Sequence, residues 1–338
     1  MTQWQDFLIS QGATIENNQV TAFAGNSGIV ANQTILADLS HIGLLQLDGE
    51  DAADFLQGQV TNDVKKLDGS NFQYAGYCTP KGRLLALFLA FAHQDHLHLQ
   101  LNRDLLEPIL KRLKMYVMRS KVTIKDVSDD IIRFGIAGPE ALSAMNSCFG
   151  AEHLPQQAYA LTTLAQSTLL RLPGDTPRYQ IYTTNDHAAE IWATLSEHAQ
   201  PADKGQWDYW EIQAGIPDIA PATQEAFVPQ MINLDALDGI NFKKGCYTGQ
   251  EIVARTHYLG KVKRRTQLSH VKSEQAPQIG DDIMSNNDVV GKVVRSAPAP
   301  EAGYELLVEL RLEILEQGSE LLWQGFALKI KPLPYPLA

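Results

Sequence analysis

Cys246 has the neighbours best suited to chemistry in this chain. Lys243 and Lys244 precede it, and Thr248 and Glu251 follow at the spacing of a capping box, which predicts a helix with Thr248 at its N-cap. Cationic side chains and the positive end of a helix both favour the thiolate form of a nearby cysteine. We therefore expect Cys246 to be a reactive group, with Lys244 beside it as the second catalytic candidate.

The loop that carries Cys246 is expected to be held in place. Tyr247 stands where it can pack on Ile252 as a hydrophobic staple. The alternative is that Cys246 is a small apolar filler, since free cysteines are among the most buried residues. The flanking lysines and glycines make the loop polar, so we favour a functional cysteine.

Trp207 is the second residue whose type suits a binding site. An indole offers a flat face to a bicyclic heteroaromatic ring, and its N–H can still find an acceptor. Residues 207–214 have the spacing of one helical face, and Gly215 and Pro217 end that helix. The alternative is a core aromatic on an amphipathic helix, and the residues alone leave both interpretations open.

The composition is that of an ordinary globular protein. The 338 residues, of which 44% are hydrophobic and 20% charged, suffice for two or three domains with separate cores. A net charge of −11 opposes binding of nucleic acid by the molecule as a whole. The 3 cysteines are widely spaced without a CxxC pair, which indicates neither a disulfide framework nor a zinc site. Neither a leader nor a membrane-spanning run is recognised, so we expect a cytoplasmic protein.

Alternating and helical patterns are mixed along the sequence, which predicts an α+β chain. Residues 84–91 and 97–101 are expected to be strands of a hairpin that turns at Gln94 and Asp95. After Gly260 the texture changes to short β-rich runs typical of a small barrel or sandwich. These runs cover residues 288–294, 304–310 and 326–330.

His93, His96 and His98 resemble a metal-binding cluster. Because His96 and His98 alternate with leucines, we expect them on the solvent-exposed face of a strand, and we predict no metal site.

The run KGCYTGQE at positions 244–251, preceded by FVPQ at 227–230, resembles the signature of the YgfZ family. The members of this family are folate-binding relatives of the glycine-cleavage T-protein. Supporting runs follow in the family's order at 56–64, 120–124 and 214–217, so the resemblance extends over nearly the whole chain.

The resemblance implies a three-domain α+β protein arranged around a central folate-binding opening, with a small C-terminal β-barrel. The domains it implies are residues 1–46 plus 128–258, an inserted domain at 47–127, and the barrel at 259–338. Tetrahydrofolate or a derivative is the implied cofactor. The residues expected to contact it are Trp207, Tyr247, Lys243, Gln250 and Arg255.

The function implied by the resemblance is that of an accessory or regulatory protein that supports iron–sulfur enzymes and thiolation of some tRNAs. Folate and iron–sulfur enzymes would be its partners, with tRNA affected indirectly and no membrane involved. A second site tryptophan of the family is replaced here by Ile42. The T-protein's catalytic aspartate has no counterpart either, because Ala86 and Leu87 stand in its place, and we therefore do not expect aminomethyltransferase activity.

Two alternatives remain open at this point. One is a tetrahydrofolate-dependent one-carbon transferase that acts on an amine or an RNA base. The other is a module that binds tRNA directly through a cluster of basic residues. This basic cluster consists of Lys243, Lys244, Arg255, Lys261, Lys263, Arg264 and Arg265.

Overall fold

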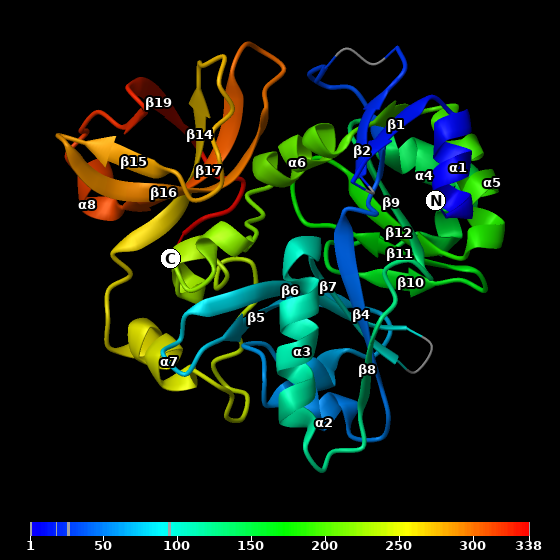
Figure 1. Ribbon diagram of the computed structural model, residues 1–338, viewed down its shortest axis with the longest axis horizontal. Coiled ribbons are helices and arrows are strands. Elements are labelled where there is room, and N and C mark those ends of the chain that lie inside the picture. The colour runs from blue at the N-terminus through cyan, green and yellow to red at the C-terminus, as the bar shows by residue number, and fades with distance from the viewer. Residues whose placement is uncertain (1, 18, 26–27, 94–95, 338) are drawn as a thin grey trace.

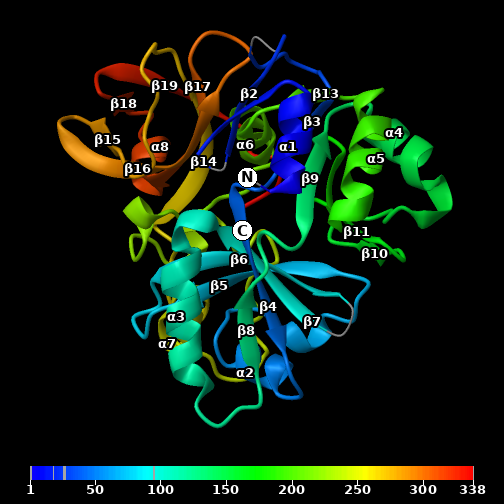
Figure 2. The ribbon, with the colours of Figure 1, turned by 45° about the vertical axis from the view of Figure 1, so that its right-hand side comes forward.

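The computed structural model describes residues 2–17, 19–25, 28–93 and 96–337. Within these residues the strands form a two-stranded hairpin, a six-stranded sheet, a five-stranded sheet and a closed barrel. Figure 1 shows the barrel at upper left, the six-stranded sheet at right and the five-stranded sheet below, with helix α6 between them. The second view shows the same three bodies around a common centre (Figure 2).

The six-stranded sheet is covered on one face by three helices whose apolar side chains share a core with it. Trp4 of α1, Met145 of α4 and Trp192 of α5 pack in this core around Phe134 of β9. The strand order is β10 (Leu161–Thr163), β11 (Ser167–Arg171), β12 (Arg178–Thr183), β9 (Ile132–Ala137), β3 (Ile35–Asp38) and β13 (Gln200–Ala202). The covering helices are α1 (Gln3–Ser10), α4 (Ala141–Phe149) and α5 (Asn185–Ser196), and β1 (Ala13–Glu16) pairs with β2 (Gln19–Phe23) beside them.

Helix α6 (Lys204–Gln213) packs on the opposite face of this sheet. Strand β9 is buried along its whole length because helices cover it on both sides, which explains its almost uninterrupted apolar sequence. Asp203 caps α6 by accepting a hydrogen bond from the backbone N–H of Gln206 at 3.0 Å.

The five-stranded sheet is antiparallel, and its longest strand reads as a continuous apolar run. The strand order is β5 (Phe72–Cys78), β6 (Leu84–His93), β7 (His96–Asn102), β4 (Ile42–Asp48) and β8 (Thr123–Asp126). Helices α2 (Ala52–Gln57) and α3 (Leu106–Val117) accompany it. Strands β6 and β7 pair as the predicted hairpin, while its turn at Gln94 and Asp95 lies outside the described residues.

The barrel follows helix α7 (Gln250–Tyr258). The small barrel or sandwich predicted from the β-rich runs after Gly260 is therefore confirmed. The predicted α+β class is confirmed as well. The barrel strands are β14 (Arg264–Val271), β17 (Tyr304–Arg311), β16 (Asp288–Pro298), β15 (Asp282–Ser285), β18 (Leu322–Trp323) and β19 (Phe326–Lys331), and α8 (Leu312–Glu316) follows β17.

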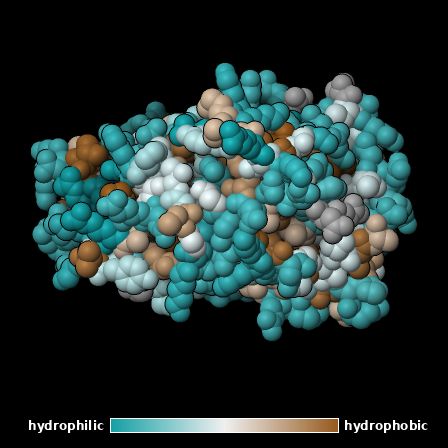
Figure 3. Space-filling view, turned by 90° about the horizontal axis from the view of Figure 1, so that it is seen from below, coloured by the Kyte–Doolittle hydropathy of each residue, from teal (hydrophilic) through white to brown (hydrophobic). Residues whose placement is uncertain are grey.

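The residue boundaries given above for the three domains stay a prediction. Strand β4 spans the expected boundary at residues 46 and 47. Among the described helices, none combines the length and apolarity that a bilayer crossing requires. On the face shown in Figure 3, hydrophobic residues form small separate clusters in a mostly hydrophilic surface.

Candidate functional site

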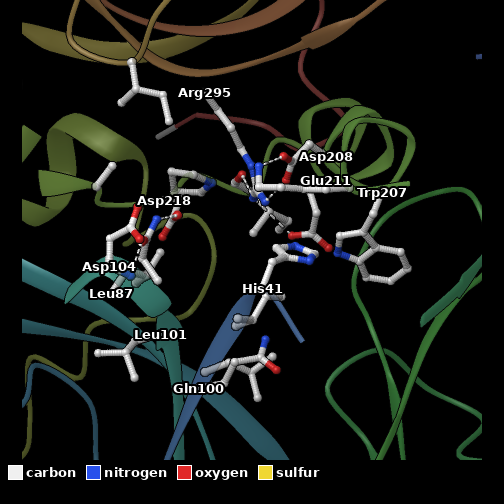
Figure 4. Close-up of a pocket in the computed structure, with 18 of the residues that line it drawn as sticks. His41, Leu87, Gln100, Leu101, Asp104, Trp207, Asp208, Glu211, Asp218 and Arg295 are labelled. Carbon is white, nitrogen blue, oxygen red and sulfur yellow. Dashed lines mark hydrogen bonds and ion pairs between the residues drawn. The ribbon is translucent and has the colours of Figure 1, made fainter. Parts of the chain in front are cut away.

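A cavity of about 200 Å³ lies where the three sheets approach one another (Figure 4). The five-stranded sheet contributes apolar and amide side chains, α6 contributes an indole and two carboxylates, and the barrel contributes an arginine. The lining includes Ile42, Leu87, Leu101, Gln100, Gln180, Trp207, Asp208, Glu211, Asp218, His41 and Arg295. This central cavity is therefore mixed in character, with an apolar wall facing a charged one.

Trp207 is fully buried on α6 at one wall of the central cavity. Its six-membered ring lies over Gly135 of β9, where an added Cβ atom would come within 2.3 Å of the ring. The indole Nε1 has no hydrogen-bond partner among the described residues, and in Figure 4 this edge points toward Glu211 and His41. The indole therefore offers the cavity a free N–H donor.

Two carboxylates follow Trp207 on α6. Asp208 binds Lys204 and also Arg295 of β16, the latter at 2.7 Å. Glu211 lies 2.5 Å from Arg178 and 3.4 Å from Arg295. Burial alone would raise the pKa of Asp208, but Lys204 and Arg295 hold that pKa well below its usual range. Asp208 is therefore anionic at neutral pH, and Arg295 joins the barrel to α6 through both carboxylates.

Two further titratable groups line the cavity. Burial lowers the pKa of His41 to about 3, so its imidazole is neutral at neutral pH. Asp218 accepts hydrogen bonds from the Asn102 amide at 2.7 Å and the Ile219 backbone N–H at 2.8 Å. Burial raises the pKa of Asp218, which therefore keeps its proton to a higher pH than a free aspartate.

Our sequence reasoning did not single out His41, Asp208, Asp218 or Arg295. Asp208 and Glu211 stand next to Trp207 on the same helix, and that spacing was a usable signal. Arg295 comes from a strand of the barrel, and local pattern cannot connect it to α6.

Two of the three positions at which this chain departs from the patterns of its expected relatives line the cavity. Ala86 and Leu87 are buried in β6, and Leu87 lines the cavity. Ile42 lines the same cavity. This wall is therefore apolar, and the carboxyl groups of the site come from α6, from Asp218 and from Asp104.

The predicted capping box at Thr248 is wrong. Helix α7 begins at Gln250, and its N-cap is Gly249, which has φ +86° and no side-chain cap. A Cβ atom at Gly249 would lie 2.5 Å from the carbonyl oxygen of Thr79. Contact with the turn between β5 and β6 therefore sets the start of the helix, and only glycine fits there. Ile252 lies against Gly82 of that turn and is 38% exposed.

Lys244 holds the Cys246 loop. Its ammonium group is buried and donates hydrogen bonds to the carbonyl oxygens of Gln57 at 2.6 Å, Val60 at 2.6 Å and Asn62 at 2.9 Å. Burial lowers the pKa of Lys244 to about 8. Its Nζ also lies 5.0 Å from the ring centre of the buried Tyr247. A catalytic role for Lys244 would require these three hydrogen bonds to be broken.

The structure does not bring Trp207 and the Cys246 loop to one cavity. Cys246 is exposed. Of the predicted site residues, the described lining of the central cavity includes Trp207 but not Cys246, Lys244, Tyr247, Lys243, Gln250 or Arg255. Lys243 lines a separate groove instead.

The basic cluster of the sequence is partly neutralised in the fold. Arg265 makes two contacts with Asp235, at 2.5 Å and 2.9 Å, and Arg264 binds Glu309, with its Nη2 at 3.0 Å. With Lys244 bound to carbonyl groups, these three cations are not free to meet an anionic partner.

The expectation that His98 faces solvent is wrong. His98 is only 1% exposed, and its ring stacks on Phe91 with centroids 5.1 Å apart. The reason is that this face of the hairpin packs toward β12, where Tyr182 lies 4.8 Å from Phe91. Within the described part of the chain, no three His, Cys, Asp or Glu side chains are placed to hold a metal ion.

Buried His98 predicts a loss of stability in mild acid. Burial lowers its pKa to about 3 from 6.5, so between these values the unfolded chain binds a proton that the folded chain does not. The contribution of neutral His98 to the free energy of unfolding is complete above pH 6.5. It decreases as the pH falls, and at pH 5 about 2 kcal/mol has been lost. Urea unfolding at pH 7.5 and at pH 5 measures this effect. We expect the free energy of unfolding to decrease between the two pH values by about 2 kcal/mol less in His98→Phe than in the natural protein.

The matched control for His98→Phe is the same change at His153, which is an exposed histidine. His153→Phe should leave the pH dependence unchanged. Identical pH dependence in both variants and in the natural protein would show that His98 is not the responsible group.

Comparison with known proteins gives the class to which this fold belongs. Residues 16–207 match the family model described as the GCVT N-terminal domain. The crystal structure of glycine cleavage system aminomethyltransferase T from Bartonella henselae superimposes with a TM-score of 0.74 over 98% of this chain and 96% of that chain, at 15% identity. The fold is therefore that of the aminomethyltransferase T proteins, as the sequence predicted.

The family within that class follows from closer relatives. The "tRNA-modifying protein YgfZ" of Sodalis glossinidius (strain morsitans) is 34% identical over 308 residues, which are 89% of this chain and 93% of that protein. The protein of the same description from Serratia proteamaculans (strain 568) is 34% identical over 310 residues, which are 90% of this chain and 93% of the relative. This chain belongs to the YgfZ family.

Proposed function

We propose that the protein binds tetrahydrofolate or a derivative in the central cavity and acts in tRNA modification. The observation that carries the proposal is the buried Nε1 of Trp207, which has no partner among the described residues and points into this cavity. A buried donor without an acceptor costs about 1–3 kcal/mol, and a ligand with an acceptor at that point removes the cost.

The donors and acceptors of the cavity fit a folate. The pterin ring of folate is flat and carries an amino group, a ring N–H and a carbonyl oxygen on one edge. Glu211 and Asp218 supply acceptors, Trp207 supplies a donor, and Ile42 and Leu87 supply an apolar wall. When bound, folate would contribute one-carbon chemistry, while these residues would hold and orient its ring and exclude water from it.

The link to tRNA comes from the relatives, which are described as tRNA-modifying proteins. We further propose that the protein supports iron–sulfur enzymes, including those that thiolate tRNA, and that Cys246 is its working group. Exposure of Cys246 on a loop anchored by Lys244 supports this role, because a thiol that meets a client protein must be accessible and fixed.

Calorimetric titration with 5-formyltetrahydrofolate tests the folate site. We expect the natural protein to bind it and Trp207→Phe to bind about three- to tenfold more weakly, which is the effect of losing one N–H donor. The control is Trp323→Phe, because Trp323 is an equally buried tryptophan of the barrel whose Nε1 donates to Asp281 at 2.8 Å. Absence of binding to the natural protein, or equal affinities in all three proteins, would overturn the folate proposal.

Complementation tests the role of Cys246. In cells that lack this protein, we expect Cys246→Ser to restore neither tRNA thiolation nor the activity of iron–sulfur enzymes, whereas Cys148→Ser restores both. Cys148 is half-buried, and burial raises its pKa to about 11, so its thiol is not the reactive one. Full restoration by Cys246→Ser would remove the cysteine from the mechanism.

A further inference from the structure

A groove of about 520 Å³ lies apart from the central cavity and shares none of its lining residues. It runs between the start of β5, Tyr159, the segment just before the Cys246 loop and the end of α7. In Figure 1, α7 lies at lower left beside the five-stranded sheet. We call this feature the α7 groove.

Three aromatic rings form one wall of the α7 groove. His257 stacks on Phe242 with centroids 3.7 Å apart and an angle of 13° between the rings, and Tyr258 stands edge-on to His257 at 4.7 Å. Tyr258 is 63% exposed, and His257 is exposed as well. Exposed rings that are already fixed by one another provide a stacking platform for a further flat ring.

Asn71, which directly precedes β5, and Gln73 of β5 supply one acceptor and one donor atom that have no partners among the described residues. Oδ1 of Asn71 and Nε2 of Gln73 are buried and unbonded among the described residues. The Nδ2 group of Asn71 donates to the carbonyl of Lys66 at 3.0 Å, which fixes the orientation of that amide. Residues two apart on an extended chain face the same side, so the free acceptor and the free donor lie on one side of the chain, and both residues line the groove. The edge of a nucleobase carries the complementary pair.

Two lysines flank the rings and amides. Lys66 and Lys243 are exposed and form no ion pair within the described residues, and Asp238 is the acidic group that lines the groove with them. The groove is thus locally cationic on a chain with a net charge of −11. An acidic peptide would use the lysines alone, whereas a nucleotide uses the lysines, the rings and the amide pair together.

We propose that the α7 groove binds a single-stranded nucleotide of RNA, with its base stacked at Tyr258 and His257 and read by Asn71 and Gln73. Lys66 and Lys243 would contact the adjacent phosphates. The identification of the RNA as tRNA rests on the proposed function, but binding of single-stranded RNA itself does not.

Fluorescence anisotropy with a fluorescein-labelled single-stranded RNA octamer tests the proposal. We expect Tyr258→Ala to weaken binding at least about fivefold, as loss of one base–ring stack does. Tyr116→Ala is the matched control, because Tyr116 is a tyrosine of α3 that is 47% exposed and lies outside the groove. In the double variant Lys66→Ala/Lys243→Ala, the slope of log affinity against log salt should decrease by about 1.4, the value for two single-strand phosphates.

Three results would overturn the proposal: unchanged affinity in Tyr258→Ala, equal losses in Tyr258→Ala and Tyr116→Ala, or tighter binding of the duplex form of the octamer. Titration of the same variants with 5-formyltetrahydrofolate separates the two proposals. Loss of RNA binding by Tyr258→Ala with folate binding unchanged supports the groove, and it does so whether or not the tRNA role holds.

Discussion

Replacing Lys244 by methionine is expected to lower the free energy of unfolding by about 3–5 kcal/mol. The methionine chain fills much of the same space but leaves the carbonyl oxygens of Gln57, Val60 and Asn62 without their donor. Val60 is fully buried and Asn62 nearly so, so water cannot easily replace the lost hydrogen bonds. Urea unfolding followed by circular dichroism measures the change.

The neighbouring Lys243→Met variant is the control for this experiment. Lys243 is exposed, so its loss should change the free energy of unfolding by no more than about 0.5 kcal/mol. Should the two variants unfold at the same urea concentration, the three carbonyl contacts of Lys244 contribute nothing to stability.

The second large effect is expected for Arg295→Met. This change leaves the buried carboxylates of Asp208 and Glu211 without the cation that joins them to the barrel. Loss of one partner from a buried ion pair costs up to about 3–5 kcal/mol, and we expect a loss near the lower end of this range because Lys204 still pairs with Asp208 and Arg178 with Glu211. The same variant should bind 5-formyltetrahydrofolate more weakly, because the positions of both carboxylates depend on Arg295. Urea unfolding and calorimetry give the two readouts.

Lys292→Met is the matched control on the same strand. Lys292 pairs with Asp282 at 2.6 Å, but both side chains are substantially exposed, so the pair is worth no more than about 1 kcal/mol. A loss in Arg295→Met as small as that in Lys292→Met would mean that the barrel does not depend on this network.

The barrel was the part of the fold that local pattern predicted best. Strands expected at residues 288–294 and 304–310 fall within the observed β16 and β17. Short strands separated by turn residues form a pattern among residues that are adjacent in the sequence. The strands can therefore be predicted without knowing which of them pair with one another. The start of α7 was misplaced for the opposite reason. Gly249 takes the N-cap position because it touches Thr79, a residue far away in the sequence.

The chemistry of the central cavity was predictable only in part. Trp207 was found because an aromatic on a helix before a Gly-Ile-Pro turn stands out locally, and it lines the cavity. Its charged neighbours acquire their roles from Arg178 and Arg295, which belong to other strands. His98 was misjudged because alternation shows which residues share a face but not what covers that face.

The origin of the cavity walls has a consequence for how a ligand acts on this molecule. Ile42, Trp207 and Arg295 come from the five-stranded sheet, from α6 and from the barrel, so none of these bodies alone forms a binding surface. A small molecule that fills the cavity must then contact all three bodies and hold them together. At a concentration one hundred times its Kd it would stabilise their association by about 2.7 kcal/mol. Binding of that molecule at its cellular concentration would thus make the whole protein more rigid.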